Sequence, residues 1–381
     1  GEVTITTTDR EKAEVLNGYF AGVFTDEDPH GVPAAADRSG GRELTEVHIT
    51  RQHIIDKIDN LKVDKSPGLD GVHPRVLTEL KNELCEPLYI IFLNSVEQGK
   101  LPDEWKAANI TALYKKEDKT SPGNYRPISL TSILCKLLES ILCDHIVGYM
   151  KSNKLFDNNQ YGFLKGRSTT MLLLKVMDEW TKILDEGDSD VNVIYADFSK
   201  DFDTVPHGRL ISKLSGYGIR GKMLTWIGEF LKDRKQRVVV QGEASSWEWV
   251  KSGVPQGSVL GPILFLIYIN DITEGIKSEA YLFADDMKLF SRVVDIHSSM
   301  VLQNDLDIVM RWTKKWLLSL NIGKCKVLAM GKGAGSFDYE VDIVSGRVRL
   351  ERSALERDLG VQVDSELTFQ EHIWGKVKTA N

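Results

Sequence analysis

Two neighbouring acids in an apolar stretch are the first residues of this sequence that suggest chemistry. The stretch "YLFADDMKLF" places Asp285 and Asp286 between two apolar runs. At about 4 Å and an effective dielectric near 20, two like charges repel by roughly 4 kcal/mol. Either a turn exposes both acids to water, a position that Asp favours, or a positive group lies between them.

A third acid shifts the balance between these alternatives. Asp197 ends another short, apolar, strand-like run, "VNVIYADFS". Two strand ends that each carry an acid out of an apolar segment suit a divalent-metal site, because Mg²⁺ prefers oxygen ligands. Two such ions, about 3.5–4 Å apart, activate an attacking oxygen and stabilise a leaving one.

Cations and a glycine-rich loop add to this picture. "LYKKED" offers Lys115 and Lys116, and "NYRPISL" offers Arg126. Each stretch alone is typical of a solvated surface, but beside a carboxylate–metal centre these cations suit the phosphates of a nucleotide. In "SGVPQGSVLGP", the Gln256 amide can meet a base or sugar, and Gly257 permits close backbone approach.

Bulk properties limit the class of protein. A chain of 381 residues favours two or three lobes over a single core. Its net charge of -7 does not indicate a general polyanion binder, so any such site must be a local basic patch. The four cysteines lack paired CxxC spacing, which favours a reducing compartment over a zinc or disulfide framework. No N-terminal signal pattern is seen, and the longest apolar stretch, "SVLGPILFLIYI", is too short and broken to span a bilayer.

The periodicity predicts helices first and a mixture of strands and helices later. Apolar residues recur at helical spacing in "DREKAEVLNGYFAGVF", "ELKNELCEPLYIIFLNSVEQG", "SILCKLLESILCDHIVGYMKS" and "VLQNDLDIVMRWTKKWLLSLN". The acids near residue 285 fall at a predicted hairpin turn, Ala284–Asp286, and "ERDLGVQVD" reads as one further short strand. We therefore predict an α+β fold, with short antiparallel strands and helices packed against one face.

The ordered motifs resemble the reverse transcriptases of non-LTR retrotransposons, of the jockey and chicken-repeat group. The blocks that carry the resemblance are "KSPGLDGVHPRVL", "NYRPISLTS", "QYGFLKGRSTT", "YADFSKDFDTVPH", "SGVPQGSVLGPILF", "FADD", "NIGKCKVLAMG" and "ERDLGVQVD". They run from about residue 10 to the end of the sequence, in the order that the family uses. So many ordered blocks make the resemblance specific.

The resemblance implies roles at the catalytic centre. Asp197, Asp285 and Asp286 take the positions of the palm aspartates that bind two Mg²⁺ ions, with Mn²⁺ as a possible substitute. Lys324 or Lys326 falls where a lysine protonates the pyrophosphate leaving group; of the two, Lys324 is the predicted catalytic residue.

The resemblance also implies a nucleotide pocket. Lys115, Lys116 and Arg126 belong to the fingers, against the incoming triphosphate. Gln256 and Gly257 line the pocket. The position of Phe202 is that of the aromatic residue that excludes a ribose 2′-hydroxyl and so favours dNTPs, with simple core packing as the alternative.

Contacts to nucleic acid follow from three further stretches. Lys165 and Arg167 in "GFLKGRS" match a block near the template, and "DLGVQVD", with Gly360, matches the primer grip. A basic run suits either the template–primer backbone or a solvated loop: Lys232, Arg234, Lys235 and Arg237.

In family terms, the expected fold is a right-hand polymerase with fingers and palm. Residues 1–48 form an N-terminal helix and linker, 49–190 the fingers with part of the palm, 191–365 the palm with its primer grip, and 366–381 the start of a truncated thumb. With the thumb largely absent, grip on the primer–template duplex is expected to be weak. With no upstream endonuclease, target-site nicking is not expected from this chain. The expected location is intracellular, in the nucleus.

The expected function is RNA-directed DNA polymerisation, with an RNA template, a DNA primer and dNTPs as partners. Asp201 departs from the family, which usually has a small residue there; at about 5 Å from a triphosphate charge it costs roughly 3 kcal/mol. A catalytically impaired nucleic-acid-binding remnant is therefore the main rival. A Mg²⁺-dependent hydrolase is a third reading, but it leaves Phe202, Gln256 and the fingers cations without a role.

Overall fold

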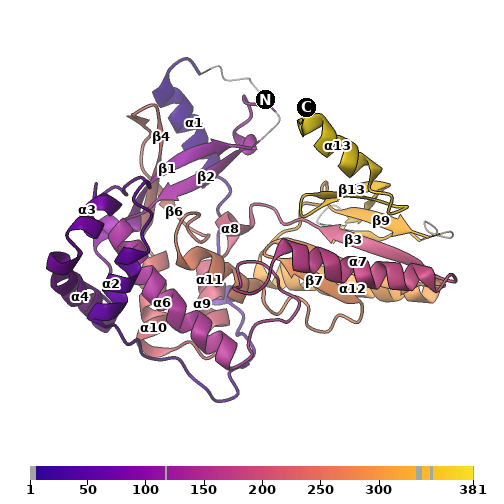
Figure 1. Ribbon diagram of the computed structural model, residues 1–381, viewed down its shortest axis with the longest axis horizontal. Coiled ribbons are helices and arrows are strands. Elements are labelled where there is room, and N and C mark those ends of the chain that lie inside the picture. Colours follow the sequence, from indigo (N-terminus) through magenta and orange to yellow (C-terminus); the bar gives the residue numbers. More distant parts are fainter. Residues whose placement is uncertain (1–5, 116–117, 332–336, 344–345, 381) are drawn as a thin grey trace. The chain divides into compact units, whose positions relative to one another are not determined.

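The chain contains both helices and strands, in agreement with the predicted α+β class (Figure 1). Within the described ranges, none of the helices combines the length and the apolar composition that crossing a bilayer requires. The computed structural model describes residues 6–115, 118–331, 337–343 and 346–380.

The chain forms two compact units, and each is assembled from two separate segments. Unit 1 comprises Gly1–Phe156 and Phe202–Tyr268, and unit 2 comprises Asp157–Asp201 and Ile269–Asn381. The four-part division predicted from the sequence assigns functional regions and stays a prediction.

Unit 1 carries most of the helices that the sequence pattern indicates. Two of its helices, α8 and α11, lie where the chain passes between the units. The elements in chain order are α1 (Asp9–Ala21), η1 (Pro29–Gly31), α2 (Arg51–Asp59), α3 (Pro74–Glu79), α4 (Lys81–Gln98), α5 (Asp103–Lys106), β1 (Ala107–Tyr114), η2 (Pro122–Asn124), β2 (Tyr125–Leu130), α6 (Ile133–Ser152), α8 (Asp201–Thr204), α9 (His207–Gly216), α10 (Gly221–Leu231), β4 (Arg234–Val240), β5 (Glu243–Ala244), β6 (Glu248–Val250) and α11 (Leu260–Ile269).

A small sheet in unit 1 has one face covered by a helix. Its strands run β2–β1–β4–β5, with β6 also paired to β4, and β1 and β4 are parallel. Helix α1 packs Ala13 and Phe20 against Ile110 of β1 and Val238 of β4. Because side chains alternate along a strand, every second residue of these strands faces α1 and the others face away.

Unit 2 is built around an antiparallel sheet. The strands run β12–β9–β3–β8–β7, and the pairing of β12 with β9 is parallel. The elements are α7 (Thr169–Asp185), β3 (Asp190–Ala196), β7 (Glu279–Phe283), β8 (Asp286–Val293), α12 (Ile296–Trp316), β9 (Lys326–Met330), β10 (Glu340–Ile343), β11 (Gly346–Arg349), β12 (Glu351–Ser353), β13 (Leu355–Asp358), β14 (Val361–Asp364) and α13 (Gln370–Ala380).

The unit 2 core explains why α7 lies on this sheet. Leu172, Val176 and Trp180 recur every fourth residue, so they form one apolar stripe along the helix. They pack in one fully buried cluster with Val193 of β3 and Phe290 of β8. This packing holds the two strands that end at the predicted catalytic acids.

One predicted element is wrong. The segment "ERDLGVQVD" is a hairpin of β13 and β14, not a single strand. Its two-residue turn, Leu359 and Gly360, has φ of +46° and +93°. Positive φ at both central residues is the geometry of the tightest hairpin turns, and Gly adopts it without strain. The Leu–Gly pair therefore reverses the chain where the apolar pattern alone suggested continuation.

Candidate active site

Strand pairing brings the three predicted catalytic acids of unit 2 together. β3 and β8 are antiparallel neighbours, and Ala196 lies opposite Met287. Asp197 directly follows β3, so it stands beside Asp286, the first residue of β8. Asp285 lies in the two-residue turn that joins β7 to β8. The predicted hairpin is confirmed, and a separate strand delivers Asp197 to it.

The three acids gather negative charge at one edge of the unit 2 sheet. Asp286 is exposed in part, yet protein surrounds much of its carboxylate, and this desolvation raises its pKa. Repulsion from Asp285 and Asp197 adds to the shift, and the pKa reaches about 6. Such a site favours cations. In the described part of the chain, no three Asp, Glu, His or Cys side chains are already close enough together to enclose a metal ion.

Lys324 is the cation beside this site. Its Nζ lies 3.7 Å from Oδ1 of Asp197, with the lysine side chain 66% exposed. The turn that carries Lys324 is fixed to the strand end, because the backbone N–H of Asn321 donates to the carbonyl of Asp197 at 2.8 Å. The alternative lysine, Lys326, pairs with Glu351 at 2.5 Å. Of the two predicted lysines, Lys324 is therefore the one that lies beside Asp197, a predicted catalytic acid.

Gln160 fixes the turn between the adjacent acids, and sequence reasoning did not single it out. The N–H of Ala284 donates to Oε1 of Gln160 at 2.8 Å, and Nε2 of Gln160 donates to the Ala284 carbonyl at 3.3 Å. Ala284 has φ of +57°. Gly162 lies so close that a Cβ there would stand 2.4 Å from the Ala284 nitrogen. The Gln and Gly of "QYGF" were the available signal, but their partner lies 124 residues away.

A buried ion pair joins the β13–β14 hairpin to β8, the strand that begins with Asp286. Nζ of Lys288 lies 2.5 Å from the Asp358 carboxylate, and each side chain is 3% exposed. Lys288 is two residues after Asp286, so it lies on the same side of β8. Gly360, the predicted primer-contacting residue, lies in the turn of this hairpin. Neither member of the pair was predicted, because each reads as surface charge in the sequence.

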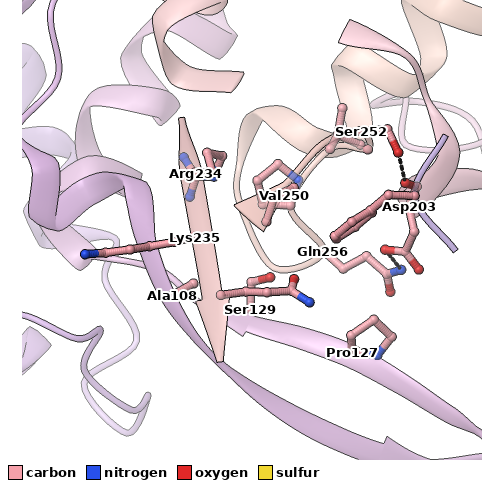
Figure 2. Close-up of a pocket in the computed structure, with 14 residues that line it drawn as sticks. Ala108, Pro127, Ser129, Asp203, Arg234, Lys235, Val250, Ser252 and Gln256 are labelled. Atoms are coloured by element: carbon pink, nitrogen blue, oxygen red, sulfur yellow. Dashed lines mark hydrogen bonds between the residues drawn. The ribbon is translucent and has the colours of Figure 1, made fainter. Parts of the chain in front are cut away.

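In unit 1, a second set of contacts organises the Gln256 loop. Nε2 of Gln256 donates to Oδ1 of Asp203 at 2.9 Å, as Figure 2 shows. The backbone carbonyl of Gln256 accepts from the N–H of Ser129 at 2.7 Å. A Cβ at Gly257 would stand 2.7 Å from the Ser129 carbonyl. Gln256 and Asp203 line a small pocket together with Ser129 and the buried Arg234. Sequence reasoning missed Asp203.

Phe202 precedes Asp203 and lies in the same unit as the pocket. Its ring stacks on Phe265 of α11, with ring centroids 4.8 Å apart and planes at 21°. The side chain is nevertheless only half-buried. One face of the ring thus takes part in packing, as the alternative interpretation expected.

The predicted phosphate-binding cations lie at the end of the β1–β2 hairpin. Lys115 directly follows β1, and Arg126 lies in β2 opposite Leu113. Both Lys115 and Arg126 are exposed. Lys116, predicted with them, lies outside the described residues.

The two predicted template residues differ in their surroundings. Lys165 is exposed in the loop before α7. The Arg167 guanidinium donates to the backbone carbonyls of Asp157 and Asn158, at 3.0 and 2.9 Å, and also to that of Gln160. Arg167 therefore shapes the loop that holds Gln160 in place.

Comparison with known proteins identifies the family to which this chain is similar. The family model described as "Reverse transcriptase (RNA-dependent DNA polymerase)" matches residues 114–356. The chain is 28% identical over 342 residues to the probable RNA-directed DNA polymerase from transposon BS of Drosophila melanogaster, covering 84% of this chain and 36% of that protein.

Two further relatives are RNA-directed DNA polymerases from the mobile element jockey. The one from Drosophila melanogaster is 27% identical, covering 85% of this chain and 36% of its own length. The one from Drosophila funebris is 27% identical, covering 96% and 41%. The chain thus spans well under half the length of these relatives. The resemblance stated from the sequence is confirmed: the chain belongs to the reverse transcriptase (RNA-dependent DNA polymerase) family, as a non-LTR retrotransposon member of the jockey group.

Proposed function

We propose that this chain supplies the fingers and palm of an RNA-directed DNA polymerase, which adds dNTPs to a primer 3′-hydroxyl on an RNA template. The observation that carries the proposal is the β3–β8 register, which sets Asp197 beside the Asp285–Asp286 turn. The predicted division assigns residues 49–190 to fingers and part of the palm, 191–365 to palm, and 366–381 to the start of a thumb.

The donor chemistry of the acids fits the divalent metal ions that this family generally uses. Asp197, Asp285 and Asp286 would hold two Mg²⁺ ions, with Mn²⁺ as a possible substitute, because hard cations take carboxylate oxygens. When bound, the ions supply positive charge for the phosphates and lower the pKa of the attacking hydroxyl. The raised pKa of Asp286 supports this assignment, since a cation relieves the repulsion that helps to raise it.

Other side chains bind, orient and transfer a proton in this proposal. Lys324, already beside Asp197, protonates the departing pyrophosphate. Lys115, Lys116 and Arg126 neutralise the triphosphate. Phe202 excludes a ribose 2′-hydroxyl, and Gln256 and Gly257 line the nucleotide pocket. For nucleic acid, we assign Lys165 and Arg167 to the template and the Gly360 turn to the primer.

The defining experiment measures dNTP incorporation on poly(rA)/oligo(dT), with and without Mg²⁺. Wild-type protein should incorporate dTTP only with the metal, and Asp285→Asn should abolish incorporation because it removes one ligand charge. Equal incorporation by wild type and Asp285→Asn would contradict the assignment of the acids.

Asp201 supports a second candidate, a nucleic-acid-binding chain that has lost catalysis. It begins α8 directly before Phe202. If its charge opposes the triphosphate by roughly 3 kcal/mol, Asp201→Ala should raise kcat/KM for dTTP about 100-fold. Equal rates for wild type and Asp201→Ala would remove Asp201 as the cause. A chain that binds poly(rA)/oligo(dT) but stays inactive with Asp201→Ala fits the second candidate.

The proposal extends to location. The four cysteines are free thiols, which suits a reducing compartment. We propose that the chain works inside the cell, in the nucleus.

A further inference from the structure

Two tryptophans and two cations form a block on one face of the unit 1 sheet. Lys235 of β4 lies opposite Trp249 of β6. Since side chains alternate along both strands, Arg237 and Trp247 extend the same face by one step. Arg237 lies 4.6 Å and Lys235 5.1 Å from the centre of the Trp247 ring. The sequence pairs "KQR" with "WEW", and this pairing places the four side chains together.

The same face continues across the sheet. Nε of Arg237 donates to Oδ1 of Asn109 in β1 at 2.8 Å. Two alternations further along β1, Leu113 lies opposite Arg126 of β2. The face thus runs over β6, β4, β1 and β2, about 14 Å across at ordinary strand spacing.

This face is open, whereas the opposite face is packed. Trp249 is 65% exposed, Leu113 55% and Trp247 38%. On the other side, α1 covers Ile110 and Val238. Figure 2 shows Lys235 extending to the side of β4 away from Asp203 and Gln256.

Lys235 and Arg237, the cations of this face, have different surroundings from Arg234 and Lys232, the other two cations of the basic run. Arg234 is buried and donates to the Phe230 carbonyl at 2.9 Å, and Lys232 pairs with Asp233 at 3.7 Å. Among the residues that the structure describes, no carboxylate forms an ion pair with Lys235 or Arg237. These two charges therefore remain available to a ligand that also stacks on tryptophan.

We propose that this open face, defined by Lys235, Arg237, Trp247 and Trp249, binds single-stranded RNA independently of its sequence. Aromatic rings stack on unpaired bases of any kind, while the neighbouring cations contact the phosphates. A duplex hides the faces of its bases and cannot use the tryptophans in this way. The chain carries a net charge of -7, so binding depends on such a local patch. The choice of RNA rests on the proposed function, but the contacts do not depend on catalysis.

The test measures binding of a short fluorescein-labelled oligo(rU) by anisotropy at several salt concentrations. Trp249→Ala should weaken binding roughly five- to a hundred-fold, with an unchanged salt slope. Lys235→Gln combined with Arg237→Gln should flatten the slope of log K against log[salt] by about 1.4. Circular dichroism and thermal unfolding confirm that each variant folds.

Two variants are matched controls. Glu248→Gln lies between the tryptophans but on the other face of β6, and Lys232→Gln removes a cation of the same run outside the sheet. Both should bind oligo(rU) nearly as wild type does. If wild-type protein binds oligo(dU) as tightly as oligo(rU), the site binds single strands but does not prefer RNA.

If affinity for oligo(rU) falls only in the control variants, or in none of the variants, the proposal is overturned. The open face would then be a candidate surface for a protein partner. Primer extension is measured separately on the same proteins. Wild type that binds oligo(rU) through these residues but fails to extend a primer would contradict the polymerase function and keep this site.

Discussion

Asp203 fixes which end of the Gln256 amide is available to a ligand. A carboxylate only accepts hydrogen bonds, so the amide turns its Nε2 toward Asp203, at 2.9 Å. The side-chain oxygen of Gln256, Oε1, is then the end that would meet a nucleotide in the proposed function. Without Asp203, the amide rotates between two orientations, and binding must select one of them.

Replacing Asp203 should therefore affect nucleotide binding more than turnover. For Asp203→Ala we expect KM for dTTP to rise about ten-fold, the effect of losing one hydrogen bond to a charged group, with kcat nearly unchanged. Asp203→Asn retains an acceptor oxygen and should stay close to wild type. Steady-state primer extension measures both constants. If Asp203→Ala has the same effect in a Gln256→Ala background, Asp203 does not act through Gln256.

At the scale of elements, the Lys288–Asp358 pair connects a short hairpin to the central sheet. The hairpin of β13 and β14 contributes Val363 to the α7 core cluster, and the buried Lys288–Asp358 pair links it to β8. A buried charge without its partner costs far more than the pair itself contributes. The Lys288–Asp358 pair therefore fixes the position of the β13–β14 hairpin relative to β8.

We expect Asp358→Ala to lower the free energy of unfolding by about 3–5 kcal/mol, because it strands the Lys288 charge. The double variant Lys288→Met, Asp358→Leu should recover most of that loss, since no charge remains buried. Urea denaturation of the single and double variants decides the matter. A double variant as unstable as Asp358→Ala would show that the loss comes from packing.

The difference between local patterns and distant contacts explains how much of this structure could be predicted from the sequence. Short apolar runs that end at acids sufficed to predict β3 and the β7–β8 hairpin, because each pattern is local. The partners of Gln160, Asp203 and Lys288 lie 124, 53 and 70 residues away, so nothing local distinguishes these side chains from ordinary polar residues. The β13–β14 turn was missed because apolar alternation continues through Leu359.

For the whole molecule, stability should depend on pH through His207, a partly buried histidine of unit 1. Nε2 of His207 lies 2.8 Å from the Gly253 carbonyl, an acceptor, so this nitrogen carries the proton of the neutral ring. Burial lowers the pKa of His207 below its ordinary value of 6.5. Protonation therefore favours the unfolded chain, in which the histidine charges more easily.

We expect the His207 contribution to be complete above pH 6.5 and to be lost as the pH falls through the lower folded-state pKa. His207→Gln keeps an N–H for Gly253 but cannot take up a proton in this range. The difference in urea midpoint between wild type and His207→Gln should shrink or reverse on acidification. A difference that is constant with pH would mean that His207 does not titrate on unfolding.

The hydrogen bonds from Gln160 to both backbone groups of Ala284 bear on how quickly the acids can rearrange. Because the N–H and the carbonyl of Ala284 are both hydrogen-bonded, the backbone of the turn between β7 and β8 has little freedom to move. For the metal ions of the proposed function, the motion that such a fixed backbone leaves to the three carboxylates is rotation of their side chains, which takes picoseconds to nanoseconds at exposed positions. Ion entry should accordingly run at the pace of rotamer exchange, with no slower loop rearrangement ahead of it.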